Sequence, residues 1–194
     1  SSSFACMVGL SLMEFCSLII STIDLIRRLR SMSDQILSRL FRHMTWANNQ
    51  LFTQLSELPE HALSFSAWNP DWTVGKIANH IVIAQGRLIS RLEKKSAPEE
   101  VEFPLTSQGM KELATKALVN DQKIQTLLGM PEEMLTFVRY GETVSYLSTS
   151  VIAQFVHHAT EHRAQIADIM AVNKMDVINL DAIDLWSFER SERN

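Results

Sequence analysis

The chain has 194 residues and a formal net charge of -4, so its length suits one domain and its charge offers no basic surface for nucleic acid. Hydrophobic residues make up 46% and charged residues 21% of the chain, which excludes a disordered protein. Six glycines and five prolines are about half of average usage, which argues against turn-rich β sandwiches and glycine-rich nucleotide-binding folds. The two cysteines, Cys6 and Cys16, form no C-x-x-C pair. A disulfide framework and a thiolate zinc site are therefore excluded, and a reducing compartment, the cytoplasm, is expected.

The N-terminal residues 4–26 are almost uncharged, interrupted only by Glu14 and Asp24. They are long enough to span a membrane, but an acidic residue near mid-bilayer costs on the order of 3 kcal/mol. A signal peptide fits poorly, because positive charge follows the apolar stretch instead of preceding it. We expect residues 1–31 to form an extra helix that packs on the rest of the chain or on a second copy, giving a homodimer, with no membrane span. A membrane anchor, or an upstream extension before a start at Met32, is the alternative.

Four further segments have apolar residues at helical spacing: 33–58, 73–95, 107–130 and 148–172. Ser33 and Thr73 are the expected N-caps of the first two, and Pro59 and Pro131 end the first and the third. Two short runs, 135–140 and 143–147, flank Gly141-Glu142 and predict a tight hairpin. The sequence thus predicts an all-α fold, in which residues 32–194 form a four-helix bundle with a small β-hairpin before the last helix.

The last predicted helix carries two histidines in the middle of an apolar stripe. At about 100° per residue, His158 and His162 fall on the same narrow face as Val151, Phe155 and Ile166. Unpartnered imidazoles there would cost on the order of 1–3 kcal/mol each. Spacing i, i+4 lets both rings reach one ion, as H-x-x-x-H pairs do for zinc. A metal ion is the expected partner.

A third ligand has to come from another helix, and His80, at the edge of the apolar face of 73–95, is the best candidate. His157 is rotated away from the pair, and His43 and His61 lie off any such face. We therefore predict one divalent ion on His80, His158 and His162. Zinc is the default for three imidazoles, with nickel and iron as alternatives.

Several polar residues are candidates for supporting roles around this centre. Asn48 falls on an apolar stripe, where its amide either orients a ligand or bridges helices. Glu161 and Gln165 lie near the two histidines on the same helix and are further second-shell candidates. Arg163 suits an ion pair between helices as well as a contact to an anionic substrate. Trp72, like Trp46 and Trp68, is interpreted as core and loop packing.

Three groups of residues carry a family resemblance: Trp46-Ala47-Asn48, Trp72-Thr73-Val74-Gly75 ahead of His80, and the H-x-x-x-H-R-x-Q string from His158 to Gln165. Together they resemble the DinB/YfiT-like superfamily of metal-binding four-helix bundles, over residues 32–194. The resemblance implies that His80, His158 and His162 take the family's metal-ligand positions. It also implies a metal-dependent thiol transferase, isomerase or hydrolase that works with low-molecular-weight thiols. Ala164 stands where the family often has glycine.

Three imidazoles leave at least one position on a divalent ion for a water or a thiolate, whose pKa the ion lowers to produce a nucleophile. The expected catalytic group is therefore that water or thiol, and the expected partner is a small-molecule substrate or a thiol. The chain lacks H-E-x-x-H, which disfavours peptidase chemistry of the zincin kind. Competing hypotheses are a noncatalytic metal-binding or stress-associated helical module and, third, a membrane-tethered interaction protein.

Overall fold

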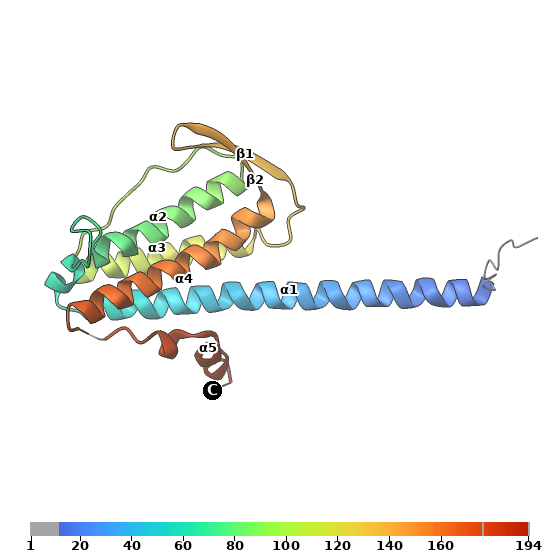
Figure 1. Ribbon diagram of the computed structural model, residues 1–194, viewed down its shortest axis with the longest axis horizontal. Helices are drawn as coiled ribbons and strands as arrows, with labels where there is room; N and C mark the ends of the chain where they lie inside the picture. The colour runs from blue at the N-terminus through green and yellow to red at the C-terminus, as the bar shows by residue number, and fades with distance from the viewer. Residues whose placement is uncertain (1–11, 176, 194) are drawn as a thin grey trace, which may run out of the picture. The chain divides into compact units, whose positions relative to one another are not determined.

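The computed structural model describes residues 12–175 and 177–193 and is mostly helical (Figure 1). Its elements in chain order are α1 (Leu12–Glu57), η1 (Glu60–Ser64), α2 (Val74–Leu92), α3 (Ser107–Gln125), β1 (Met134–Arg139), β2 (Glu142–Leu147), α4 (Ser148–Val172), η2 (Leu180–Ile183) and α5 (Leu185–Ser191). The predicted helical fold with a small hairpin before the last long helix is confirmed. None of the helices in the described parts of the chain combines the length and apolar content that a membrane span requires.

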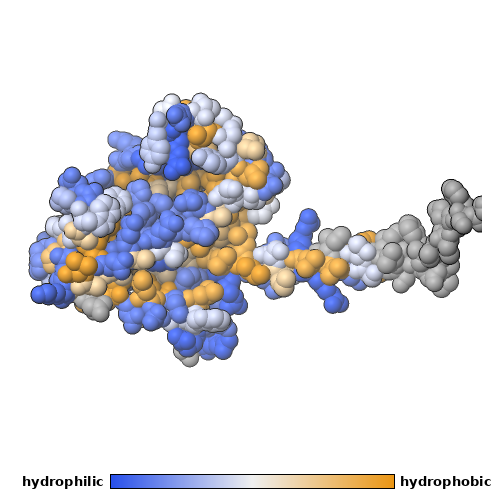
Figure 2. Space-filling view, viewed as in Figure 1, coloured by the Kyte–Doolittle hydropathy of each residue, from blue (hydrophilic) through white to orange (hydrophobic). Residues whose placement is uncertain are grey.

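The chain divides into two compact units, Ser1–Ser38 and Arg39–Asn194. Within the first unit, residues 12–38 are helical, as expected for the N-terminal segment, whereas residues 1–11 lie outside the described residues. Hydrophobic side chains are interleaved with hydrophilic ones along this helical segment (Figure 2). Among those that are exposed, Leu25, Leu29, Met32 and Ile36 follow one another at spacings of four, three and four residues.

The predicted helix start at Ser33 is wrong, because α1 runs without interruption from Leu12 to Glu57. Ser33 lies inside the helix, and its Oγ donates a hydrogen bond to the Leu29 carbonyl at 3.0 Å. Between Leu12 and Leu58 the sequence contains neither glycine nor proline. Extending an existing helix costs much less free energy than nucleating a new one, so a good cap residue does not start a helix where nothing interrupts the preceding one.

The second unit is a bundle in which residues 39–57 of α1 lie beside α2, α3 and α4 (Figure 1). Each helix contributes fully buried apolar side chains, among them Leu51, Ile81, Leu113 and Phe155. The Phe41 and Phe155 rings have their centroids 6.3 Å apart, which joins α1 to α4. Because burial of one such side chain contributes about 1.5–3 kcal/mol, this core fixes the rotation of each helix about its axis.

The helix ends follow the local capping chemistry. Thr73 caps α2 as predicted, accepting a hydrogen bond from the Lys76 amide at 3.4 Å. Thr106 caps α3 in the same way through the Gly109 amide at 3.1 Å. The α3 helix ends at Gln125, short of the predicted residue 130, and a turn with Gly129 at a φ of 83° carries the chain onward. Glycine adopts this left-handed conformation readily, so Gly129 lets the chain turn after the helix has ended and before Pro131.

The hairpin forms with its turn one residue earlier than predicted. Arg139 pairs with Glu142, so the turn residues are Tyr140 and Gly141 in place of Gly141 and Glu142. Both have positive φ, 52° and 83°. A two-residue turn of this type requires positive φ at both positions because its backbone twist matches that of the strands.

Candidate metal centre

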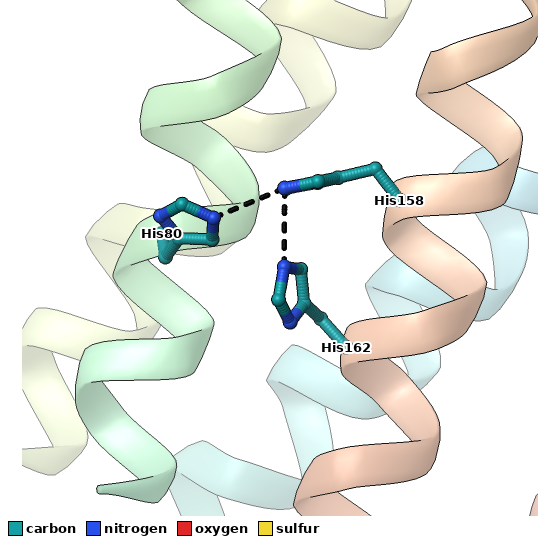
Figure 3. A group of neighbouring side chains, drawn as sticks. All are labelled: His80, His158 and His162. Atoms are coloured by element: carbon teal, nitrogen blue, oxygen red, sulfur yellow. Dashed lines mark hydrogen bonds between the residues drawn. The ribbon is translucent and has the colours of Figure 1, made fainter. Parts of the chain in front are cut away.

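Helices α2 and α4 bring three histidine side chains together, as Figure 3 shows. His158 and His162 lie one turn apart on α4, with their Nε2 atoms 3.1 Å apart. The Nε2 atom of His80, on α2, lies 3.0 Å from that of His158. One ring nitrogen from each of the three residues lies within 4.8 Å of those of the other two. The structure therefore gathers the three residues on which the sequence prediction rests.

The spacing of these nitrogens suits a metal ion. Imidazole nitrogens bind zinc at about 2.0–2.1 Å, and tetrahedral coordination then separates two such nitrogens by about 3.3 Å. The separations of His158 Nε2 from the Nε2 atoms of His80 and His162, 3.0 and 3.1 Å, are slightly shorter than this. All three nitrogens lie within 4.8 Å of one another, so modest movements of the rings would let the three histidines hold one ion.

Two of the histidines, His80 and His158, lie in surroundings that favour their neutral form. Partial burial, followed by the nearby His162 and Arg87, lowers the pKa of His80 to about 4. Burial also lowers the pKa of His158 to about 3, assisted by His162 and His80. A neutral imidazole has a free lone pair, so these two side chains present metal-binding nitrogens at neutral pH.

Gln165 determines the tautomer of His162. Its Oε1 lies 2.8 Å from His162 Nδ1 and accepts a hydrogen bond from Trp72 Nε1 at 3.3 Å. The indole nitrogen can only donate, so the amide atom that faces it is the oxygen, and His162 Nδ1 must carry a proton. The lone pair of His162 is then on Nε2, which faces the other two histidines.

Trp72 belongs to the centre, which the sequence analysis missed. Its ring meets those of His80 and His162 edge-on, with centroids 5.2 and 5.9 Å apart. Trp72 precedes the cap of α2 in a loop. No periodic pattern applies to a loop, so the only sequence signal was its place in the Trp72-Thr73-Val74-Gly75 motif.

Asn48 and Glu161 lie apart from the hydrogen bonds that join the three histidines. Asn48 is fully buried, and its Oδ1 accepts a hydrogen bond from Arg163 Nη1 at 2.8 Å. Arg163 is itself 4% exposed, and its partner across the helices is this neutral amide; the ion pair and the contact to an anionic substrate both stay predictions. Glu161 is exposed and lies on the wall of the cavity described next. Supporting roles for Asn48 and Glu161 at a metal stay predictions.

A cavity of about 470 Å³ opens beside the histidines, between α2, α4 and the hairpin. Its walls include the three histidines, together with Arg87, Arg91 and Tyr146. Clefts of roughly 300–1,000 Å³ hold small molecules in many proteins. The arrangement thus combines a metal-binding group of side chains with room for a small ligand.

A second polar cluster is buried inside the bundle and joins Asp121 of α3 to Gln85 of α2. Asp121 is 2% exposed and accepts a hydrogen bond from Gln85 Nε2 at 2.8 Å. Burial raises the pKa of Asp121 to about 7, against the opposing hydrogen bonds from Gln85 and Thr45 and the charge of Arg163. Burial likewise lowers the pKa of Arg163 to about 10, while Asp121 opposes that change.

The fold and the site define a class of protein: a helical bundle whose histidines, contributed by two helices, could hold one metal ion. The model of the DinB family matches residues 32–172, and the chain belongs to this family. A comparison with curated proteins gave no match.

Proposed function

We propose that the protein is a metal-dependent enzyme in which His80, His158 and His162 bind one divalent ion, zinc by default and nickel or iron as alternatives. The observation that supports this proposal is the convergence of three ring nitrogens at the wall of a cavity. A bound ion would lower the pKa of a water or a low-molecular-weight thiol and so supply a nucleophile. The reaction would be of the transferase or hydrolase type.

The chain's own residues prepare this chemistry. Gln165 keeps the proton of His162 on Nδ1 and so leaves Nε2 free, and the edge of Trp72 restricts the rotation of two of the rings. Among the described residues, the group of potential ligands contains three members and no carboxylate. Three protein ligands on a tetrahedral ion leave one position for water, thiol or substrate, which favours an enzyme over the alternative, a noncatalytic metal-binding module.

Elemental analysis of the purified protein tests the ligand set. The variants are His158→Ala and, as a matched control, His157→Ala, which removes an exposed imidazole from the adjacent position. We expect one equivalent of metal in the wild type and in the control, and none in His158→Ala. A full equivalent in His158→Ala would refute the assignment.

The open position is tested with cobalt(II)-loaded protein and 2-mercaptoethanol. Binding of the thiolate to the ion should produce an intense charge-transfer absorption band in the near ultraviolet. No band at saturating thiol, in protein that holds a full equivalent of cobalt, would favour the noncatalytic module.

A further inference from the structure

The cavity beside the histidines has a strongly cationic wall. Arg87 and Arg91 follow His80 on α2 by seven and eleven residues, which places all three on one stripe of the helix. Arg139, from the end of β1, lines the same cavity. Three guanidinium groups from two elements therefore face the space into which the histidines open.

Two of these three guanidinium groups have no carboxylate partner among the described residues. Arg87 donates from Nε to Glu100 at 2.8 Å and is neutralised. Arg91 instead lies over the Phe137 ring, with Cζ 4.3 Å from its centroid. Arg139 lies beside Tyr140, 5.1 Å from the ring centroid. Aromatic faces orient a guanidinium group but carry no net charge to balance it.

The positive charges of this wall lie close enough to repel one another, which favours the binding of an anion between them. Burial lowers the pKa of Arg91, and the charges of Arg139 and Arg87 lower it further. Arg91 is half-buried and Arg139 is exposed, so the Arg91 side of this pair is screened less by water than the Arg139 side. Glu161, the acidic residue on the same wall, is exposed. An anion between Arg91 and Arg139 would relieve the repulsion between like charges.

The geometry also sets the length of such a ligand. Arg91 follows His80 by eleven residues, which is about 16 Å along the helix axis. An arginine side chain can reach back over roughly one turn of helix, or about 5 Å, so the charged end of the ligand would lie on the order of 10 Å from the histidines. The cavity of about 470 Å³ has room for a small molecule of that length.

We propose that the substrate or thiol of this protein is a small anion, whose carboxylate or phosphate group binds between Arg91 and Arg139 while its reacting end lies at the three histidines. Guanidinium groups suit both anions because their planar fork of N–H donors matches two oxygens at once. This inference rests on the proposed function for the reacting end, and on the arginines alone for the anionic end.

The first experiment uses cobalt-loaded protein and two thiols of equal length, 6-mercaptohexanoate and 6-mercaptohexanol. The charge-transfer band measures the affinity of each thiol. We expect the wild type to bind the carboxylate thiol about tenfold more tightly or better. Arg91→Gln and Arg139→Gln should each reduce this preference without changing the affinity for the neutral thiol. Lys116→Gln, which removes one charge from an exposed position on α3, is the matched control and should retain the preference.

The second experiment needs no metal. Succinate and inorganic phosphate are titrated separately into metal-free protein by calorimetry, and the tighter ligand identifies the anion class. Anion binding that is lost in Arg91→Gln but kept in Lys116→Gln supports the inference. It would do so even if no thiol bound to the cobalt protein, because failure to bind thiol would refute only the proposed function. Equal affinity for the two thiols, with no anion binding that depends on Arg91 or Arg139, would overturn the inference while leaving the metal centre intact.

Discussion

The buried carboxyl of Asp121 makes the stability of the bundle depend on pH. Burial raises the pKa of Asp121 from its ordinary value of 3.8 to about 7. Between these two values the folded protein keeps a proton that the unfolded chain has released. The free energy of unfolding must therefore fall as pH rises through this window. Asp121→Asn keeps the shape of the side chain and removes the titration.

The size of the effect follows from the two pKa values. A group that titrates at 3.8 unfolded and about 7 folded loses about 2 kcal/mol of stabilisation between pH 5 and pH 7. Other groups, including His43, whose pKa burial lowers, are present in both proteins and cancel in the difference. Asp121→Asn, which mimics the protonated carboxyl, should therefore gain stability relative to the wild type as pH rises, and the difference between the two proteins should grow by about 2–3 kcal/mol from pH 5 to pH 8.

Urea unfolding followed by circular dichroism, at pH 5, 6, 7 and 8 in the presence of a chelator, measures this difference. Asp168→Asn removes the same charge from an exposed position on α4 and controls for net charge. A difference between wild type and Asp121→Asn that does not change with pH would refute the reasoning. So would a wild type that gains stability relative to Asp121→Asn as pH rises.

Three further predictions concern the metal and the N-terminal helix. Removal of the metal should lower the melting temperature, because a ligand at a hundredfold excess over its Kd stabilises the folded state by about 2.7 kcal/mol, or roughly 5–10 °C for a chain of this size. An unchanged melting temperature after verified metal removal would show that metal binding is not coupled to folding. Gln165→Leu removes the hydrogen-bond acceptor of His162 Nδ1 and should weaken metal binding about 10- to 100-fold in a competitive chelator titration, whereas Gln165→Glu keeps an acceptor and should keep the metal affinity. An equal loss of affinity in both variants would contradict the tautomer argument. We also expect the full chain to form a dimer through the exposed stripe Leu25, Leu29, Met32 and Ile36. Light scattering should therefore find a monomer for a version that starts at Met32, which lacks the first two of these side chains, and membrane retention of the longer form alone would contradict this.

The sequence alone was sufficient to predict features that depend on the residues of a single helix or turn. The rotation of 100° per residue places His158 and His162 on one face of a helix whatever surrounds it, and Thr73 caps α2 through its own near neighbours. The bounds of α4 and the existence of the hairpin follow from the same local periodicity and turn chemistry. These features required only the order of the residues along one segment.

Tertiary structure decided what depends on contacts between segments. Whether His80 meets the α4 pair depends on how α2 and α4 rotate against the shared core, and Trp72 reaches the centre from a loop that has no periodicity to predict its direction. The burial of Arg163 against Asn48 is a contact between α4 and α1. The cationic wall that faces the histidines likewise combines Arg91 with Arg139, which are 48 positions apart in sequence and lie together only because the hairpin folds over α2. Such contacts arise from the burial of apolar surface by the whole bundle, a free energy that no single segment contains.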